Sequence, residues 1–259
     1  MARSNNKISV VGAGYVGATL AQRIFESGIA DVVLLDIFAG IAAGKALDLL
    51  DAAPIARHDR SIKGSGDYAD LGSSDIVVIT AGLARRPGMT REELVSKNRS
   101  TVRDVSSNVK RYAPDAIVIV VTNPLDAMAY EAYRTTGFKK ERVMGMAGVL
   151  DTARFIELLS EELKVPRSAI TTYVLGSHGD TMVPVISQTL VQKKPVDKLL
   201  APEKLKGIIE RTRNRGAEIV EHLGTGSAYY SPSAAVFGMV RAILKDTKET
   251  LAVSAYLEG

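Results

Sequence analysis

The sequence predicts an α/β protein in which a doubly wound parallel sheet is followed by a second, α+β domain. Two observations predict the sheet: apolar runs of Val and Ile alternate with helical segments through the first half, and a glycine-rich turn joins the first run to a helix. The second half has shorter strand candidates between amphipathic helices. We therefore expect domains at residues 1–146 and 147–259.

The first strand, Lys7 to Val11, ends in a turn that carries three closely spaced glycines. Gly12 would make the tight turn, Gly14 would let a pyrophosphate approach the backbone, and Gly17 would let the helix pack closely on the strand. The amino end of that helix would face the phosphates, because its unpaired N–H groups and its dipole favour negative charge. This spacing predicts a dinucleotide-binding turn of the Rossmann type.

An acidic residue closes the second apolar run. The segment Asp31 to Asp36 is typical of a strand, and its last residue follows Gly17 by about 20 positions, as expected of the residue that binds a ribose diol. A carboxylate at this place accepts hydrogen bonds from the free hydroxyls of NAD and repels the additional phosphate of NADP. Asp36 therefore favours NAD. The alternative is that Asp36 is only a turn residue at the end of a strand.

Strands and helices continue to alternate up to residue 145. Continuous Val and Ile runs predict strands covered on both faces, and the helices between them predict parallel crossovers. We expect strands at 61–64, 75–81, 116–122 and 142–145, and helices at 39–53, at 91–112 and from Pro124. The apolar residues between Ile37 and Ala53 suit a core helix and a subunit interface equally well.

The second half changes character. We expect helices at 148–163 and at 203–223, with strands at 171–175 and 182–190 between them. The last segment, Ala252 to Gly259, has the composition of a further strand. The apolar positions of the helix at 203–223 are expected at Ile208, Ile209, Ile219, Val220 and Leu223.

Composition narrows the class of protein. The chain has no cysteine, so disulfides, thiolate zinc sites and a cysteine nucleophile are excluded. Its formal charge is +4, but Lys and Arg are interleaved with Asp and Glu and tryptophan is absent, so we expect no nucleic-acid partner. No apolar run is long enough to span a bilayer. We expect a cytoplasmic enzyme with a small-molecule substrate and no membrane partner.

Two segments of the second half carry the chemistry. Asp151 and Arg154 lie three residues apart on an expected helix, and His178 lies in the sequence Gly-Ser-His-Gly-Asp. A carboxylate orients an imidazole and stabilises its charged form, and a guanidinium binds a substrate carboxylate with two parallel hydrogen bonds. These groups suggest proton transfer next to a carboxylate clamp. The alternatives are a surface ion pair for Asp151 and Arg154 and a structural role for His178.

Several motifs in this order resemble the lactate/malate dehydrogenase family along the whole chain, and within it most resemble the malate dehydrogenases of the lactate-dehydrogenase-like group. The motifs are Gly12-x-Gly14-x-x-Gly17, Asp36, Thr80-Ala-Gly82, Arg85-Arg86-Pro-Gly-Met-Thr-Arg91, Asn123-Pro-Leu-Asp, Gly148-Val-Leu-Asp151-x-x-Arg154 and Gly176-Ser-His178-Gly-Asp180. The resemblance implies hydride transfer between a 2-hydroxy acid and NAD. It also implies a homodimer or homotetramer.

The resemblance assigns catalytic roles to four residues. His178 resembles the general acid and base that exchanges a proton with the substrate oxygen, and Asp151 resembles its partner. Arg154 looks like the clamp on the first carboxylate of the substrate. Arg91 looks like the group that polarises the carbonyl. The segment from Gly82 to Arg91 is expected to fold over the substrate.

The resemblance also assigns binding roles. Asn123 would hydrogen-bond near the reacting oxygen and the nicotinamide, and Asn98 joins Asn123 as a cofactor-binding residue. Arg85, six residues before Arg91, would bind a second substrate carboxylate and so favour malate over lactate. The adjacent Arg86 is the alternative by one position.

The end of the sequence departs from the family pattern. The family continues with a partner strand and a long final helix, so we expect the second domain to be C-terminally incomplete. Two readings remain beside a malate dehydrogenase: a dehydrogenase of lactate or another 2-hydroxy acid, and a catalytically silent NAD-binding fragment.

Overall fold

The computed structural model of the chain describes residues 6–83 and 90–258, and of Arg91 only the backbone. These residues form two compact units. Unit 1 contains residues up to 145 together with 229–249 and the segment from 255, and unit 2 contains 146–228 and 250–254. The domain boundary that we expect near residue 146 remains a prediction. The packing also places residues 229–249, which come much later in the chain, in unit 1.

The parallel sheet predicted for the first half is confirmed. Its order is β3-β2-β1-β4-β5-β6, so the chain reverses direction across the sheet between β1 and β4. Neighbouring strands are parallel throughout, with Ile8 of β1 opposite both Val32 and Ile76. The strands are β1 Lys7–Val11, β2 Asp31–Leu35, β3 Ile62–Ser65, β4 Ile76–Ile79, β5 Ile117–Val120 and β6 Val143–Gly145.

Helices cover the sheet. Alternate residues of the strands, among them Val11, Val77 and Val118, pack with Val105 and Met128 of the helices α3 and α4 in one apolar cluster. The same alternation points the other strand residues to the opposite face, near α1 and α2. The helices of unit 1 are α1 Tyr15–Glu26, α2 Ala39–Ala56, α3 Arg91–Tyr112, α4 Leu125–Thr136 and α7 Tyr230–Lys245.

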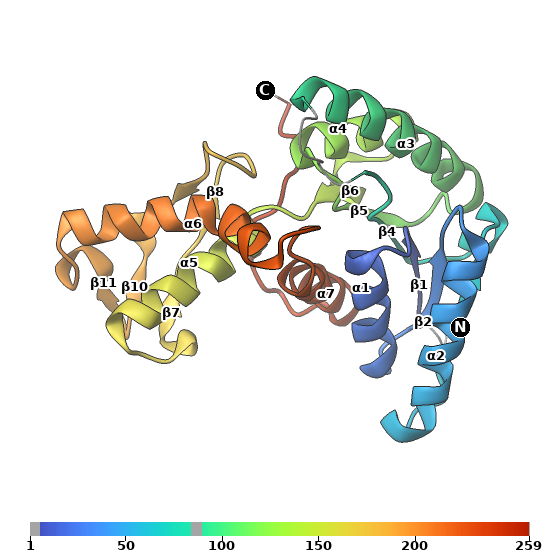
Figure 1. The fold of residues 1–259 in the computed structure, drawn as a ribbon, viewed down its shortest axis with the longest axis horizontal. Helices are drawn as coiled ribbons and strands as arrows, with labels where there is room; N and C mark the ends of the chain where they lie inside the picture. Colours follow the sequence, from blue (N-terminus) through green and yellow to red (C-terminus); the bar gives the residue numbers. More distant parts are fainter. Residues whose placement is uncertain (1–5, 84–89, 259) are drawn as a thin grey trace. The chain divides into compact units, whose positions relative to one another are not determined.

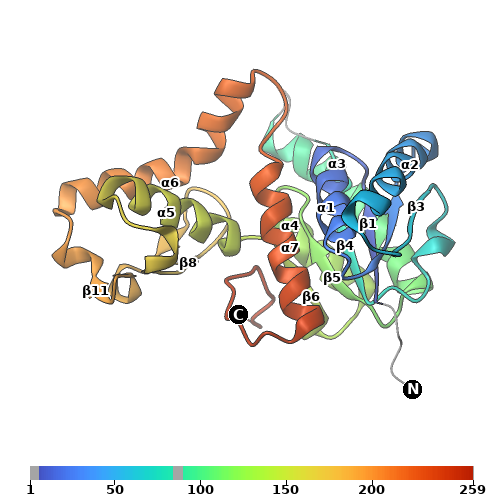
Figure 2. The same ribbon diagram turned by 90° about the horizontal axis from the view of Figure 1, so that it is seen from below.

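Helix α7 was not predicted from the sequence. It lies beside α1 in both ribbon views (Figures 1 and 2). Arg23 of α1 donates to the hydroxyl of Ser233 on α7 at 3.1 Å. The helix buries Val236, Met239 and Val240 at helical spacing, and that spacing is the sequence signal that could have revealed it.

Unit 2 contains two long helices and small antiparallel sheets. Helix α5 Gly148–Leu163 was predicted correctly, and α6 spans Pro202–Leu223. The small strands are β7 Ile170–Thr171, β8 Val174–Leu175, β9 Val183–Pro184, β10 Leu190–Val191 and β11 Lys194–Pro195, in sheets of order β11-β10-β7 and β8-β9. Short 3-10 helices in the described residues are Tyr68–Leu71, Lys140–Arg142, Arg167–Ala169, Ile186–Gln188 and Val196–Lys198.

Four sequence predictions in this half are wrong in detail. The strand expected at 171–175 is divided between two sheets, and the one expected at 182–190 is interrupted by a 3-10 helix. Val220 and Leu223 of α6 are exposed rather than part of an apolar core face. The end of the chain is not a strand, because only Ser254 forms an isolated bridge in the described part. Instead, the carbonyl of Ala252 accepts the N–H of Val149 at 2.7 Å and so covers the first turn of α5.

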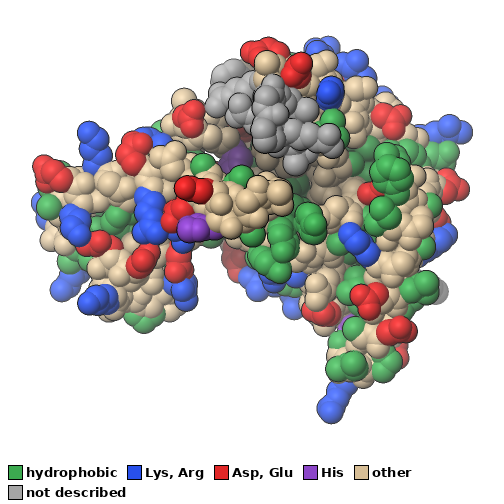
Figure 3. All heavy atoms as spheres, viewed as in Figure 1, with side chains coloured by type: hydrophobic (Ala, Val, Ile, Leu, Met, Phe, Trp, Pro, Cys, Tyr) green, Lys and Arg blue, Asp and Glu red, His purple; other side chains and the backbone are tan. Residues whose placement is uncertain are grey.

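Exposed apolar side chains mark helix α2. Ile41, Leu47 and Ile55 are 51%, 64% and 83% exposed. Figure 3 shows hydrophobic side chains on the surface at the far end of this helix. Helix α2 therefore carries exposed apolar side chains, which a role as a core helix alone does not explain. Across the described ranges, every helix is too short or too polar to cross a membrane.

Candidate active site

Two of the three glycines of the first turn are required by the packing of the chain itself. Gly12 has a φ of +108°, and a Cβ there would lie 2.7 Å from the hydroxyl of Thr80. A Cβ at Gly17 would lie 1.9 Å from the carbonyl oxygen of Gly12, so only glycine lets α1 approach the turn. Thr80 donates to that same carbonyl at 3.0 Å and holds the turn closed.

Gly14 differs from its two neighbours. It has a φ of −69°, and nothing lies within 4 Å of the position where its Cβ would be. Neither backbone strain nor packing therefore requires glycine at the residue that caps α1. A pyrophosphate that approaches the amino end of this helix does require that space, so the turn fits a dinucleotide.

Asp36 lies against the glycine turn. One carboxylate oxygen accepts the N–H of Ala13 at 2.6 Å and the other accepts the N–H of Phe38 at 3.0 Å. These bonds hold a negative charge at the end of β2, where the sequence predicts binding of a ribose diol. Lys45 of α2 donates to the carbonyl of Ala13 in the same turn. Sequence reasoning missed Lys45, because a lone lysine on a helix gives no signal.

The two asparagines expected at the cofactor come from the segment after β5 and from helix α3. Asn123 is exposed and lies three residues after the end of β5. Asn98 is fully buried in α3, and its side chain donates to the carbonyl of Asn123 at 2.6 Å. The structure thus brings these two residues together within unit 1.

In unit 2, His178 and Asp151 form the predicted pair. Nδ1 of His178 lies 2.8 Å from one carboxylate oxygen of Asp151, and the Asp151 side chain is only 2% exposed. An ionised carboxylate can only accept, so Nδ1 donates and Nε2 is the nitrogen that exchanges a proton with a substrate. A purely structural histidine explains this geometry less well, because the His178 side chain is still 18% exposed and so remains accessible to a ligand.

Arg154 lies one helical turn after Asp151 and is largely buried. Its side chain is 11% exposed, and Nη1 lies 3.7 Å from the second carboxylate oxygen of Asp151, too far for a hydrogen bond. Nε of Arg154 and that oxygen have no hydrogen-bond partner in the described residues. Burial, with the charge of Arg215, lowers the pKa of Arg154 although Asp151 opposes this. A buried guanidinium with unused donors suits a carboxylate ligand.

The sequence around these residues explains their placement. A Cβ at Gly148 would lie 2.2 Å from the carbonyl oxygen of Val174, so this glycine lets the start of α5 approach β8. Thr152 then accepts the N–H of Val174 at 2.9 Å. Gly176, with a φ of +82°, begins the loop that returns His178 over Asp151.

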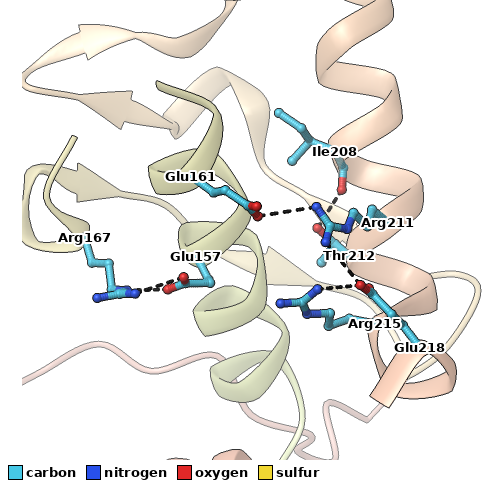
Figure 4. Close-up of polar contacts among 8 residues, drawn as sticks. All are labelled: Glu157, Glu161, Arg167, Ile208, Arg211, Thr212, Arg215 and Glu218. Atoms are coloured by element: carbon cyan, nitrogen blue, oxygen red, sulfur yellow. Dashed lines mark hydrogen bonds and ion pairs between the residues drawn. The ribbon is translucent and has the colours of Figure 1, made fainter. Parts of the chain in front are cut away.

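Side chains from α6 also contact the loop that carries His178 and the helix that carries Asp151 and Arg154. Arg213 donates to the carbonyl of Met182, at the end of the loop that carries His178, at 3.3 Å. Figure 4 shows Arg211 of α6 between Glu161 of α5 and Glu218 of α6, and the contact with Glu161 connects the two helices. Arg211 and Arg215 lower the pKa of Glu218 to about 2. Sequence reasoning missed these arginines, because they do not belong to any of its motifs.

Two expected site residues are not tested by this geometry. Arg85 lies outside the described residues, as does its alternative Arg86. Arg91 is the first residue of α3, and its backbone position follows from a capping box between Thr90 and Glu93. The segment expected to fold over the substrate falls mostly within the undescribed residues.

Comparison with known proteins identifies the family to which both units belong. Residues 6–145 match the NAD-binding domain model of lactate/malate dehydrogenases, and residues 148–259 match the alpha/beta C-terminal domain model of the same family. The malate dehydrogenase of Chlorobium limicola is 53% identical over 254 residues, which cover 98% of this chain and 82% of that protein.

Solved structures agree with the sequence matches. The apo malate dehydrogenase of Picrophilus torridus has a TM-score of 0.95 at 43% identity, with 99% of this chain and 81% of that chain covered. A lactate dehydrogenase of Cryptosporidium parvum, complexed with lactic acid and nicotinamide adenine dinucleotide, has a TM-score of 0.95 at 38% identity, with 99% and 82% covered. The chain belongs to the lactate/malate dehydrogenase family.

Proposed function

We propose that this chain is an NAD-dependent malate dehydrogenase, which interconverts malate and NAD with oxaloacetate and NADH, a reaction of the tricarboxylic acid cycle. The observation that carries this proposal is the His178 and Asp151 pair beside the buried Arg154. This pair occurs in a chain that is about half identical to named malate dehydrogenases.

The proton step follows from the orientation of His178. When bound, NADH would supply the hydride that the carbonyl carbon of oxaloacetate accepts. Nε2 of His178 donates a proton to the carbonyl oxygen, and the carboxylate of Asp151 stabilises the imidazolium before the transfer and fixes the ring by its bond to Nδ1. In the reverse direction the neutral ring accepts the proton of the malate hydroxyl at the same nitrogen.

Substrate binding is assigned to the cations. Arg154 would bind the carboxylate next to the reacting carbon through its unused donors. Arg91 would polarise the carbonyl, and Asn123 would hydrogen-bond the reacting oxygen. These roles orient the substrate and so reduce the entropic part of the barrier.

Cofactor binding is assigned to the edge of the unit 1 sheet. Gly14 leaves room for the pyrophosphate, and Gly12 and Gly17 shape the turn that presents it. Asp36 would bind the ribose hydroxyls of NAD. Asn123, which is exposed, would contact the nicotinamide, and Asn98, the other asparagine expected at the cofactor, donates to its backbone carbonyl.

Arg85 is proposed to select malate over lactate by pairing with the second carboxylate of the substrate. The test is the ratio of kcat/KM for oxaloacetate to kcat/KM for pyruvate in Arg85→Gln. Loss of one partner of such a pair costs about 2 to 5 kcal/mol, so we expect the ratio to fall by roughly thirty-fold or more. Arg86→Gln is the matched control and should leave the ratio unchanged. An unchanged ratio in Arg85→Gln, with a fall in Arg86→Gln, would move the assignment to Arg86.

Lactate is the second candidate substrate, because a lactate dehydrogenase structure matches this chain as well as a malate dehydrogenase does by TM-score. The same ratio in the unchanged chain separates the two. A preference for pyruvate would support a lactate dehydrogenase. NADH binding without turnover of either 2-oxo acid would support a silent NAD-binding chain.

We also propose a cytoplasmic homodimer or homotetramer without a nucleic-acid or membrane partner. Support for self-association comes from the exposed apolar side chains of α2, because monomers rarely leave such residues grouped on one helix. Sedimentation of the purified chain tests this, and a monomer at micromolar concentration would contradict it.

A further inference from the structure

Asn98 is fully buried, although the sequence assigns it to the cofactor. Its exposed fraction is 0%, while Asn123, its neighbour in space, is exposed. A side chain without accessible surface has no contact to offer a dinucleotide unless the surrounding structure moves.

The side-chain amide of Asn98 is saturated by the backbone of two other segments. Oδ1 accepts the N–H of Leu83 at 2.8 Å. Nδ2 donates to the carbonyl of Leu83 at 3.1 Å and to the carbonyl of Asn123 at 2.6 Å. Both N–H hydrogens of the amide therefore donate, and its oxygen accepts one hydrogen bond.

The amide stands where the sheet ends. The ladder between β4 and β5 ends near the bond from the N–H of Val121 to the carbonyl of Ile79. Beyond it, Thr122 donates to the carbonyl of Ala81 at 2.7 Å, and Asn98 then connects Leu83 to Asn123. The amide therefore bridges the two segments at the point where the direct hydrogen bonds between β4 and β5 have ended.

The fit around the amide is close. Gly82 has a φ of +152°, and a Cβ there would lie 2.5 Å from Cγ2 of Thr122 and 3.1 Å from Oδ1 of Asn98. Only glycine lets the chain pass between these groups. Small changes in the position of Asn98 would be transmitted to Asn123 through its backbone carbonyl, since the bond between them is short.

We propose that Asn98 is a positioning residue that sets the backbone at Asn123 and Leu83 and acts on cofactor and substrate without touching either. The proposal rests on the proposed function, in which the side chain of Asn123 meets the nicotinamide and the reacting oxygen. Loss of the amide leaves the carbonyl of Asn123 and the N–H of Leu83 without these partners, and unpaired buried groups favour a shift of the backbone.

The first test compares Asn98→Ala with Asn108→Ala, a control on the same helix whose amide bonds only within α3. We expect Asn98→Ala to lower kcat with oxaloacetate by roughly 10- to 100-fold, while the affinity for ADP-ribose, which lacks the nicotinamide, changes by less than about threefold. The control should match the unchanged chain in both. Equal losses of kcat and of ADP-ribose affinity would overturn the proposal, because they indicate direct contact with that half of the cofactor or a general loss of structure.

A double-mutant cycle separates positioning from direct contact with the nicotinamide half. In an Asn123→Ala background, the proposal expects Asn98→Ala to lower kcat/KM by no more than about threefold further, because the side chain that it positions is gone. Independent, additive losses would contradict the proposal.

Hydrogen exchange provides a readout that does not need activity. The amide of Leu83 should exchange faster in Asn98→Ala and should stay protected in Asn98→Asp, which keeps the accepting oxygen. Unchanged exchange in Asn98→Ala would overturn the proposal. If the unsubstituted chain binds NADH but does not turn over oxaloacetate, the proposed function is refuted. The exchange rate of the Leu83 amide still decides the role of Asn98 in that case.

Discussion

Two regions treat their polar groups in opposite ways: the edge of the unit 1 sheet at which we propose that NAD binds, here the cofactor edge, and the group of Asp151, Arg154 and His178 in unit 2 to which we assign proton transfer and substrate binding, here the catalytic cluster. At the cofactor edge the chain bonds its own groups: Asp36 accepts two backbone N–H groups, and Asn98 bonds the backbone at Leu83 and Asn123. In the catalytic cluster, one oxygen of Asp151 and Nε of Arg154 carry no hydrogen bond within the described residues.

This difference indicates what each region recognises. A dinucleotide is bound largely by shape, backbone N–H groups and a helix end, so the edge can be rigid and internally bonded beforehand. A small charged substrate must be held by donors that the chain does not use itself. Because an unpaired buried polar group costs roughly 1 to 3 kcal/mol, the cluster keeps these groups at the expense of stability.

The largest expected effect separates the two regions. His178→Asn should lower kcat/KM for oxaloacetate by about 10²- to 10⁴-fold, because it removes the general acid, and should leave NADH affinity within about twofold. His222→Asn, at the exposed end of α6, is the matched control and should behave as the unchanged chain. Steady-state kinetics and NADH fluorescence titration measure both. Loss of activity in His222→Asn alone would refute the assignment of the catalytic cluster.

A substitution at the cofactor edge should give the reverse pattern. Asp36→Asn removes the charge with little change of shape, and we expect NADH affinity to fall by roughly tenfold or more, since hydrogen bonds to charged groups contribute about 1.5 to 3 kcal/mol. The ratio of NADPH to NADH affinity should rise. Asp31→Asn, at the other end of β2, is the control. If NADH affinity did not change, Asp36 would be only the turn residue that the sequence left as an alternative.

Glu131 of unit 1 is also bonded within its own unit. It is 6% exposed, and its two carboxylate oxygens each lie 2.7 Å from an arginine Nε, one of Arg99 and one of Arg103. Burial raises its pKa, but the hydrogen bonds of Arg103 and Arg99 outweigh burial and lower it below 4.5. The stability that Glu131 contributes is therefore present above about pH 4.5 and is lost as the pH falls through its lowered pKa.

Glu131→Gln should thus destabilise the chain by about 1 to 2 kcal/mol at pH 7, less than for a fully buried pair because both arginines are half exposed. Urea denaturation at several pH values checks this, with the exposed Asp115→Asn as control. If the difference in the free energy of unfolding between Glu131→Gln and the unsubstituted chain increased as the pH fell, the prediction would be contradicted.

The smallest effect concerns the catalytic cluster. Gly216 lies within α6, and a Cβ there would lie 3.7 Å from Nη2 and 3.8 Å from Nη1 of Arg154. Gly216→Ala should stabilise the helix by roughly 1 kcal/mol and raise the KM for oxaloacetate by less than about tenfold. Gly207→Ala, on the same helix with nothing within 4 Å, should stabilise similarly without a change in KM. Equal KM values in both variants would show that the clamp tolerates a methyl group.

The sequence predicted the sheet and the pairing of His178 with Asp151 well, for physical reasons. Strands covered on both faces need continuous apolar residues, and the runs at β1, β2, β4 and β5 have them. The spacing of Asp151 and Arg154 on one helix is visible in any sequence. Short strands such as β8 and β9 could not be delimited, because they contain too few residues for a periodic pattern.

Packing over long sequence distances accounts for the rest. Helix α7 carries Pro232 and Gly238 inside an otherwise regular apolar pattern, so local preference opposed its prediction while contact with α1 stabilises it. The burial of Asn98 also follows from tertiary structure, since nothing in its neighbouring residues marks it as the partner of Leu83 and Asn123. The expected strand after Ala252 is absent from the described residues because the carbonyl of Ala252 pairs with the start of α5.

The central claim is that the catalytic cluster and the cofactor edge together reduce a dicarboxylic 2-oxo acid. The most direct measurement is NADH oxidation by the purified chain with oxaloacetate and, separately, with pyruvate, after NADH binding has been confirmed by fluorescence. We predict turnover with oxaloacetate and a kcat/KM at least roughly thirty-fold above that for pyruvate. NADH binding with no turnover of oxaloacetate, or a preference for pyruvate, would contradict the account.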